Sequence, residues 1–247
     1  MHYLYVKAKT GYDLSAPSRP GGAVRFLPLI LLFVGLFLLA SAAGPIFFYQ
    51  FLLSPRFKTE LVKPVNDEFL AASSQSNKVL AEDTQEPTLD MSQVSNWFPT
   101  APRLLPRPSK ITHYTLSLPK LKIKEAVVQI GGEDLKKSLI QYQGTAFPGQ
   151  FGNAVIFGHS TLPQFFNPQN YLSIFSTLPS LKKKDLILVD FDGVSYRYVV
   201  EEMFEVKPDD ISVLEQRFDD AYLTLVTCVP PGTYLRRLVV KARLNLP

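Results

Sequence analysis

Cysteine is nearly absent from this chain. Cys228 is the one cysteine among 247 residues, which excludes an intramolecular disulfide and any zinc or iron–sulfur site built on several thiolates. Histidine is also scarce, with only His2, His113 and His159, and this argues against a histidine-rich metal site. We therefore expect the protein to use neither a metal nor another cofactor.

Charged residues are sparse and unevenly placed. They make up 19% of the chain, which is low for a soluble protein, and the net charge is +4. Much of the positive excess lies in the N-terminal flank, where Lys7, Lys9, Arg19 and Arg25 outnumber a single acid, Asp13. The remainder of the chain has no basic face of the kind that binds nucleic acid, so we expect no nucleic-acid partner.

A long apolar run, Phe26–Leu53, accounts for the low charge. No charged residue lies between Arg25 and Arg56, and the run exceeds the roughly 20 residues that cross a bilayer as a helix. A cleaved signal peptide is the alternative, because Ala40-Ser41-Ala42 resembles a cleavage site, but the apolar part of a signal peptide is shorter. We predict a retained single-pass membrane anchor over 26–53. Positive flanks stay cytoplasmic, so 1–25 is expected inside and the rest outside.

Residues 54–108 are rich in proline and contain the polar run Ser73-Ser74-Gln75-Ser76-Asn77. Such a composition predicts an extracytoplasmic linker that buries little surface. Trp97-Phe98 is an apolar pair within this polar setting. Two interpretations are open: the pair packs against the following domain, or it forms a lid over a groove.

From residue 109 to residue 247, short apolar runs alternate with turn residues. Strands are expected over Tyr114–Leu118, Ile123–Ile130, Asn153–Phe157, Asp185–Phe191, Val194–Val206, Ala221–Thr227 and Leu235–Leu244. Asp192-Gly193 predicts a hairpin turn, and short helices are expected over Glu133–Leu139 and Ile211–Gln216. Many short strands with brief helices are typical of a mainly β domain, either a barrel or a sandwich.

Cys228 stands at the end of an expected strand, immediately before Val229-Pro230-Pro231-Gly232. An unpaired cysteine in an exported protein is either a small buried apolar residue or a reactive thiol. His159 follows a strand that ends in glycine. It is either a surface residue or the base that a thiol of pKa about 8.5 needs in order to become a nucleophile.

An arginine of the last strand is a third candidate for a catalytic residue, beside Cys228 and His159. An antiparallel return of the last strand brings Arg236 and Arg237 to about 5 Å from the thiol. A guanidinium at that distance stabilises the oxyanion of an acyl-transfer intermediate, unless the arginine simply faces solvent.

These residues carry a resemblance to the sortase family. Gly144–Gly149 (GTAFPG) and Gly152–His159 (GNAVIFGH) resemble the histidine region of sortases. Thr224–Cys228 (TLVTC) matches the family's TLxTC signature, and Arg237–Val240 (RLVV) resembles its RLxV arginine strand. The similarity extends from about Tyr114 to Leu244.

The resemblance implies a closed sortase-type β-barrel with short helices, preceded by one transmembrane helix, and a cysteine transpeptidase activity. Cys228 would attack a peptide bond in the C-terminal sorting motif of exported surface proteins and form a thioacyl enzyme. His159 would protonate the leaving amine and deprotonate the incoming one, a cell-wall peptide amine. Arg237 would position the substrate carbonyl and stabilise the oxyanion, and Thr227 would help to shape substrate or oxyanion contacts.

Strand alternation leaves the choice of arginine open. Arg236 shares a strand face with Leu238 and Val240, whereas Arg237 shares a face with Val239 and Lys241. Alternation alone would turn Arg236 inward, while the resemblance selects Arg237. Arg236 is therefore the second candidate for supporting the oxyanion.

Subclass and alternatives follow from a few further residues. Pro230, two residues after the cysteine, resembles sortases of classes C, D and E. The absence of a C-terminal membrane helix argues against class C, so we expect a class D- or E-like protein.

Another cell-wall cysteine enzyme, an L,D-transpeptidase, would have Ser-x-Gly-Cys where this chain has Leu225-Val226-Thr227-Cys228. A non-catalytic membrane-tethered β-barrel binding module would be favoured by loss of His159, Cys228 or the arginine, and all are present.

Overall fold

The computed structural model describes residues 22–57, 90–101 and 104–245. Contacts divide the chain into two units, Met1–Ser41 and Ala42–Pro247. The apolar run forms helix α1 (Gly22–Phe48), which continues into the π-helix η1 (Tyr49–Leu53) and the short helix α2 (Ser54–Phe57). Phe26–Phe57 is long and apolar enough to cross a membrane, as the sequence predicts. The predicted cytoplasmic flank lies almost entirely outside the described residues.

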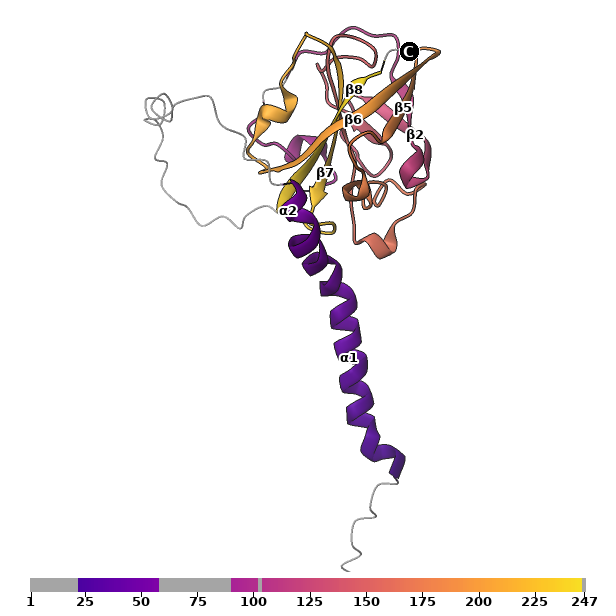
Figure 1. Ribbon diagram of the computed structural model, residues 1–247, viewed down its shortest axis with the longest axis vertical. Coiled ribbons are helices and arrows are strands. Elements are labelled where there is room, and N and C mark those ends of the chain that lie inside the picture. The colour runs from indigo at the N-terminus through magenta and orange to yellow at the C-terminus, as the bar shows by residue number, and fades with distance from the viewer. Residues whose placement is uncertain (1–21, 58–89, 102–103, 246–247) are drawn as a thin grey trace, which may run out of the picture. The chain divides into compact units, whose positions relative to one another are not determined.

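Eight strands close into a barrel in the order β1-β2-β3-β4-β7-β8-β6-β5 (Figure 1). Their bounds are β1 His113–Leu118, β2 Ile123–Ile130, β3 Leu139–Gln141, β4 Gly152–Phe157, β5 Leu186–Phe191, β6 Val194–Val206, β7 Ala221–Val229 and β8 Arg236–Leu244. Two pairs are parallel, β2 with β3 and β4 with β7, and the others are antiparallel. The prediction of a mainly β, closed barrel is confirmed.

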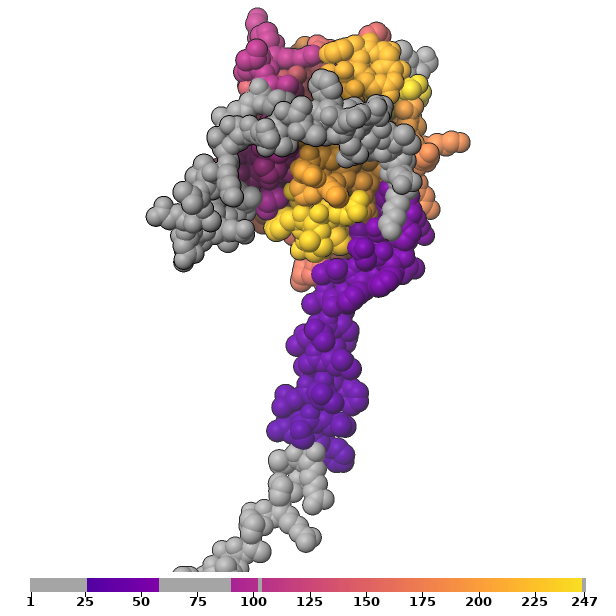
Figure 2. Space-filling view, turned by 90° about the vertical axis from the view of Figure 1, so that its left-hand side faces the viewer, coloured from indigo at the N-terminus to yellow at the C-terminus, as the bar shows by residue number. Residues whose placement is uncertain are grey.

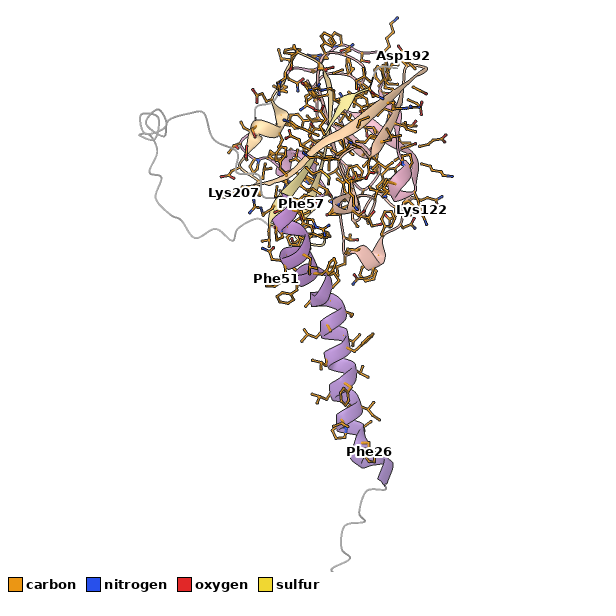
Figure 3. All side chains as sticks on the ribbon, viewed as in Figure 1. Phe26, Phe51, Phe57, Lys122, Asp192 and Lys207 are labelled. Atoms are coloured by element: carbon orange, nitrogen blue, oxygen red, sulfur yellow. The ribbon has the colours of Figure 1, made fainter. Side chains whose placement is uncertain are left out.

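One-turn helices lie before and between the strands: η3 (Val94–Asn96), η4 (Pro119–Leu121), η5 (Pro163–Phe165), η6 (Leu178–Ser180) and η7 (Ile211–Leu214). The β5–β6 hairpin turns at Asp192 and Gly193, whose φ angles of 53° and 74° suit an Asp-Gly turn. Figure 3 places Asp192 at the tip of this hairpin and Lys207 just beyond the other end of β6. The helical turn expected from Ile211 is present as η7.

The prediction of a helix over Glu133–Leu139 is wrong, because these residues form a turn followed by a strand. The Asp134 carboxylate accepts a hydrogen bond from the Lys136 amide at 3.0 Å, which closes a turn, and Leu139 begins β3. The amide of Leu135 donates to the Ser92 carbonyl at 2.9 Å, and the Leu135 side chain is fully buried. Contacts with a distant segment therefore override the local helical preference, and they also explain why the three-residue strand β3 was not predicted.

Alternating side chains of the strands build two apolar clusters. Leu223, Leu225 and Val229 of β7 join the cluster inside the barrel. Val226 and Cys228 point the other way and join a second cluster on the outer surface of the barrel. Cys228 therefore lies on the outer face of the sheet, beneath a cover that other parts of the chain supply.

The end of the helical segment packs on the barrel within the second unit. Phe57 belongs to the interior cluster, and the Tyr49 hydroxyl donates to the Glu205 carboxylate at 2.7 Å. Arg236 lies 3.0 Å from the same carboxylate, and Ser54 donates to it at 3.4 Å. In Figure 2 the indigo residues around α2 lie against the yellow residues of the C-terminal strands. Within the predicted linker 54–108, residues of the described stretches 54–57 and 90–101 contact the barrel. The predicted boundaries of the flank, anchor, linker and catalytic domain remain predictions.

Replacing Tyr49 with phenylalanine should lower the free energy of unfolding by about 1–2 kcal/mol, because the buried Glu205 carboxylate loses a donor. Urea unfolding of the full chain in detergent measures the effect. Tyr234→Phe is the matched control, since Tyr234 is 54% exposed. Equal midpoints for both variants would contradict a stabilising role for the Tyr49–Glu205 contact.

Candidate active site

Three neighbouring strands bring His159, Cys228 and Arg237 to the same level of the barrel. Phe157 pairs with Val226 in the parallel β4–β7 ladder, so the residue two places further on, His159, lies level with Cys228. On the other side of β7, Cys228 pairs directly with Arg237 of β8. Side chains of directly paired residues start about 5 Å apart. The thiol is thus flanked by an imidazole on one side and a guanidinium on the other.

Two buried hydroxyls hold the His159 loop to the Cys228 strand. Thr227 donates to the Gly158 carbonyl at 2.8 Å, and Ser160 donates to the Cys228 carbonyl at 2.7 Å. Thr227 is fully buried on the opposite face of β7 from Cys228, so its hydroxyl is engaged within the protein. Sequence reasoning missed Ser160, because a serine in a loop gives no signal of the carbonyl it will meet.

Gly158 is needed for the close approach of these elements. A Cβ built at Gly158 would lie 2.5 Å from the Phe175 ring and 2.6 Å from Leu139. The Gly158 amide donates to the Val226 carbonyl at 3.1 Å, which extends the β4–β7 ladder by one bond. The glycine before His159 therefore sets the position of the imidazole relative to β7.

Arg237 is 1% exposed, which is unusual for an arginine. Its Nη1 donates to the carbonyl of Tyr234 at 3.0 Å and its Nη2 to the carbonyl of Trp97 at 3.1 Å. Its Nε has no hydrogen-bond partner among the described residues. The guanidinium therefore keeps donor capacity on the face of the sheet that carries the thiol.

Arg236 projects to the other face of β8. Its Nε lies 3.0 Å from the buried Glu205 carboxylate, at the end of the apolar face that it shares with Leu238. Strand alternation thus turns Arg236 toward the barrel interior, as the sequence indicates. The structure puts Arg237, and not Arg236, on the face of Cys228, because the cysteine lies outside the barrel.

Trp97 covers these three residues. Its ring is fully buried, lies 5.9 Å from the His159 ring edge to face, and has the Arg237 guanidinium 5.3 Å from its centroid. The indole Nε1 donates to the Met91 carbonyl at 2.7 Å. Phe98 packs beside it, 5.9 Å from the Phe157 ring.

Backbone contacts hold this cover in place. The amide of Val94 donates to the Glu133 carbonyl at 3.1 Å, and the amide of Ser95 donates to the Glu133 carboxylate at 3.1 Å. The bond from Leu135 to Ser92 completes the attachment. Residues 91–98, here called the cover segment, therefore pack on the outer face of the barrel directly over the candidate site.

Burial sets the protonation of the site. Burial raises the pKa of the Cys228 thiol to about 12, although Arg237 acts in the opposite direction. Burial also lowers the pKa of His159, whose Nε2 has no hydrogen-bond partner among the described residues. With the cover segment in place, the pair is therefore a neutral thiol and a neutral imidazole at pH 7.

No group of three or more His, Cys, Asp or Glu side chains within residues 22–57, 90–101 and 104–245 is placed to hold a metal ion. The groups available for chemistry are those of an acyl-transfer site: a thiol, an imidazole and a guanidinium.

Alkylation of Cys228 by iodoacetamide in the folded chain should rise about tenfold per pH unit from pH 7 to pH 10, because the thiolate fraction keeps increasing up to a pKa of about 12. In the urea-unfolded chain, the rate should level off above a pKa of about 8.5. The raised pKa also means that the buried thiol stabilises the fold fully below about pH 8.5, and that this contribution is lost as the pH rises toward 12. A plateau below pH 9 in the folded chain would contradict this prediction.

Much of the barrel is similar in sequence to known proteins. The family model described as a sortase domain matches residues 116–245, just over half of the chain. Sortase A of Staphylococcus aureus is 30% identical over 128 residues, covering 45% of this chain and 58% of that protein. Sortase A of Bacillus anthracis is 30% identical over 128 residues, covering 51% of this chain and 56% of that protein. The chain thus spans less than two thirds of the length of these curated relatives. Among solved structures, a Clostridium perfringens sortase D5 transpeptidase is 26% identical with a TM-score of 0.47, covering 55% of this chain and 79% of that one.

Proposed function

Because the chain belongs to the sortase family, we propose that it is a membrane-anchored cysteine transpeptidase that joins exported proteins to an amine of the cell wall. The observation that carries this proposal is the row of His159, Cys228 and Arg237 on three adjacent strands. A thiol nucleophile, a proton carrier and an oxyanion stabiliser are the parts that acyl transfer needs.

The first half-reaction forms a thioester. The His159 imidazole takes the thiol proton as the Cys228 sulfur attacks the carbonyl carbon of a peptide bond in the substrate's sorting motif, and the carbonyl oxygen takes up the negative charge. Arg237 donates hydrogen bonds to that oxygen. As the C–N bond breaks, His159 protonates the leaving amine, and the acyl group remains on sulfur.

The second half-reaction reverses these roles. The amine of a cell-wall peptide attacks the thioester carbon, and His159 removes a proton from it. As the C–S bond breaks, His159 returns that proton to the departing Cys228 sulfur, and a new amide is the product. Thr227 and Ser160 support both steps as positioning residues. Their hydroxyls donate to the backbone carbonyls of Gly158 and Cys228 and so hold the His159 loop against the Cys228 strand.

The cover segment acts as a lid in this scheme. The Trp97 carbonyl already accepts a hydrogen bond from Arg237 Nη2 at 3.1 Å, so it occupies a donor that a substrate oxygen would use. The Trp97 ring also keeps solvent from the His159 imidazole. Substrate binding therefore requires the cover segment to move and to release the guanidinium.

The proposed orientation has the N-terminal flank in the cytoplasm and the barrel outside, because Lys7, Lys9, Arg19 and Arg25 precede the apolar helix. The partners in this proposal are exported proteins with a C-terminal sorting motif and an amine acceptor of the cell wall. The proline two residues after Cys228 resembles classes C, D and E, and within that group the proposal is a class D- or E-like member.

The test uses the full chain in detergent, because residues 49–57 and 91–98 contact the barrel. The protein is incubated with a library of sorting-motif peptides and an amine acceptor, and products are followed by mass spectrometry beside Cys228→Ala. A ligated product or a thioacyl adduct, absent in the variant, is expected.

Two outcomes would contradict the proposal. If Cys228 is alkylated but forms no adduct with any peptide, even in a Trp97→Ala background, the chain is a non-catalytic barrel that binds a partner. If the acyl donor is instead a cell-wall stem peptide, the chain belongs with the other cell-wall cysteine transpeptidases.

A further inference from the structure

An apolar groove of about 560 Å³ lies where the helical segment meets the loops of the barrel. One wall is the end of the helical segment and the other comes from three loops; the lining residues are Gly44, Pro45, Phe48, Tyr49, Leu53, Pro163, Ser176, Thr177, Pro179, Ser180 and Pro231. All of them belong to the second unit, Ala42–Pro247. The volume is in the range of pockets that bind small molecules.

The helical wall of the groove belongs largely to the part of the apolar segment that exceeds the thickness of a bilayer. Phe26–Phe57 has 32 residues, which gives a helix of about 48 Å against a hydrocarbon core of about 30 Å. A hydrocarbon core that begins after Arg25 would end near Pro45. The apolar helical turns beyond Pro45 would then lie in the interfacial region of the bilayer. Phe47 and Phe51 there are 61% and 72% exposed, which is expected of residues that meet lipid.

The groove has almost no hydrogen-bonding capacity to offer an occupant. Ser180 donates to the Thr177 carbonyl at 2.7 Å, and Ser176 accepts from the Thr161 amide at 2.8 Å. The Thr177 hydroxyl is buried and has no hydrogen-bond partner among the described residues, and the rest of the lining consists mainly of apolar side chains.

The apolar lining of the groove favours one kind of ligand over others. An extended polypeptide would leave its backbone N–H and C=O groups unpaired in such a groove, which is costly. One turn of a helix about 10 Å across would fill most of the volume, so a helix does not fit lengthwise. An acyl chain has no polar groups along its length and is abundant where the groove opens.

We propose that this groove binds the acyl chain of a bilayer lipid. The lipid would contact the helix on one side and Pro163, Pro179 and Pro231 on the other. Pro231 lies in the turn that follows Cys228, and Pro163 lies in the loop that follows His159. A bound chain thus links the membrane to both loops that leave the candidate active site, and the proposal does not depend on catalysis.

The experiment places the full chain in nanodiscs of phosphatidylglycerol and phosphatidylcholine that contain a phosphatidylcholine with a diazirine on its acyl chain. After illumination, digestion and mass spectrometry locate the labelled residues. Labelling of the loop residues Pro163, Thr177–Ser180 and Pro231 is expected, at a level at least tenfold above that of exposed apolar residues far from the groove, such as Val194.

Gly44→Trp is the test variant, because a Cβ at Gly44 meets nothing within 4 Å and Gly44 lines the groove. It should lower labelling of the loop residues about tenfold. Gly35→Trp is the matched control: its Cβ also meets nothing within 4 Å, it belongs to the same helix, and it is not among the residues that line the groove. This control should leave loop labelling unchanged.

Three results would overturn the proposal. Labelling confined to the helix, with none on the loops, would mean that no lipid enters the groove. Loop labelling that survives Gly44→Trp would mean that the lipid reaches the loops by another route. Native mass spectrometry that finds a peptide or a second copy of the chain bound in a manner abolished by Gly44→Trp would assign the groove to that occupant instead.

Discussion

Replacing Arg237 with alanine is expected to lower kcat/KM for peptide ligation by about 10²- to 10³-fold, the cost of removing a main donor to an oxyanion. The reason is its place on the strand: it pairs with Cys228, it is 1% exposed, and its Nε has no partner among the described residues. The measurement is ligation of the best peptide from the library, with product quantified over substrate concentration.

Arg236→Ala is the matched control, since it removes the same side chain from the adjacent position. Arg236 contacts the buried Glu205, so its loss should lower the free energy of unfolding by about 1–3 kcal/mol while the folded fraction keeps its kcat/KM within about tenfold. Arg237→Lys keeps the charge but not the planar pair of donors, and should recover only part of the activity. Full activity in Arg237→Ala, with loss in Arg236→Ala, would assign the oxyanion role to Arg236.

Replacing Trp97 with alanine is expected to raise the alkylation rate of Cys228 at pH 7.5 by about 10²-fold or more. The thiol has a pKa of about 12 because it is buried, and the Trp97 ring is a main part of the cover over this site. If the opened thiol approaches an ordinary pKa of about 8.5, its thiolate fraction increases by about three orders of magnitude. The rate is measured with iodoacetamide under pseudo-first-order conditions.

Two controls separate exposure of the site from general loosening of the fold. Trp97→Phe keeps an aromatic ring over His159 and should change the rate only a few-fold. Phe165→Ala removes an aromatic side chain that is 66% exposed and should leave the rate unaltered. An unchanged rate in Trp97→Ala, with its unfolding midpoint preserved, would contradict the view that the cover segment shields the thiol.

Local patterns predicted most strands of the barrel because each strand carries its own periodicity. Ile123–Ile130 and Val194–Val206 have the expected bounds, and the Asp-Gly hairpin between β5 and β6 forms as its turn residues indicate. The three-residue strand β3 has too few residues for a periodicity, and the turn at Asp134 depends on contacts with Ser92 that no local window contains.

The candidate site was predictable in its residue types but not in its geometry. His159, Cys228 and Arg237 each stand at a strand end or beside a turn, which left a reactive or an ordinary role open for each, and the resemblance to sortases selected them as proton carrier, nucleophile and oxyanion donor. Alternation along β8 correctly separated the faces of Arg236 and Arg237. It could not say which face carries the site, because that depends on whether the reactive residue points into the barrel or out of it.

The sequence by itself determined the apolar helix, the strand-rich domain and the chemistry-bearing residues, because hydrophobic periodicity, turn residues and side-chain type are all local properties. Tertiary structure alone decided that Cys228 lies outside the barrel, that Trp97 covers it, and that Tyr49 and Glu205 join the helical segment to β6. These three facts depend on burial and on contacts between residues far apart in the chain. A contact across 156 positions, such as that of Tyr49 with Glu205, leaves no trace in a local pattern, because only the closed barrel brings the two residues together.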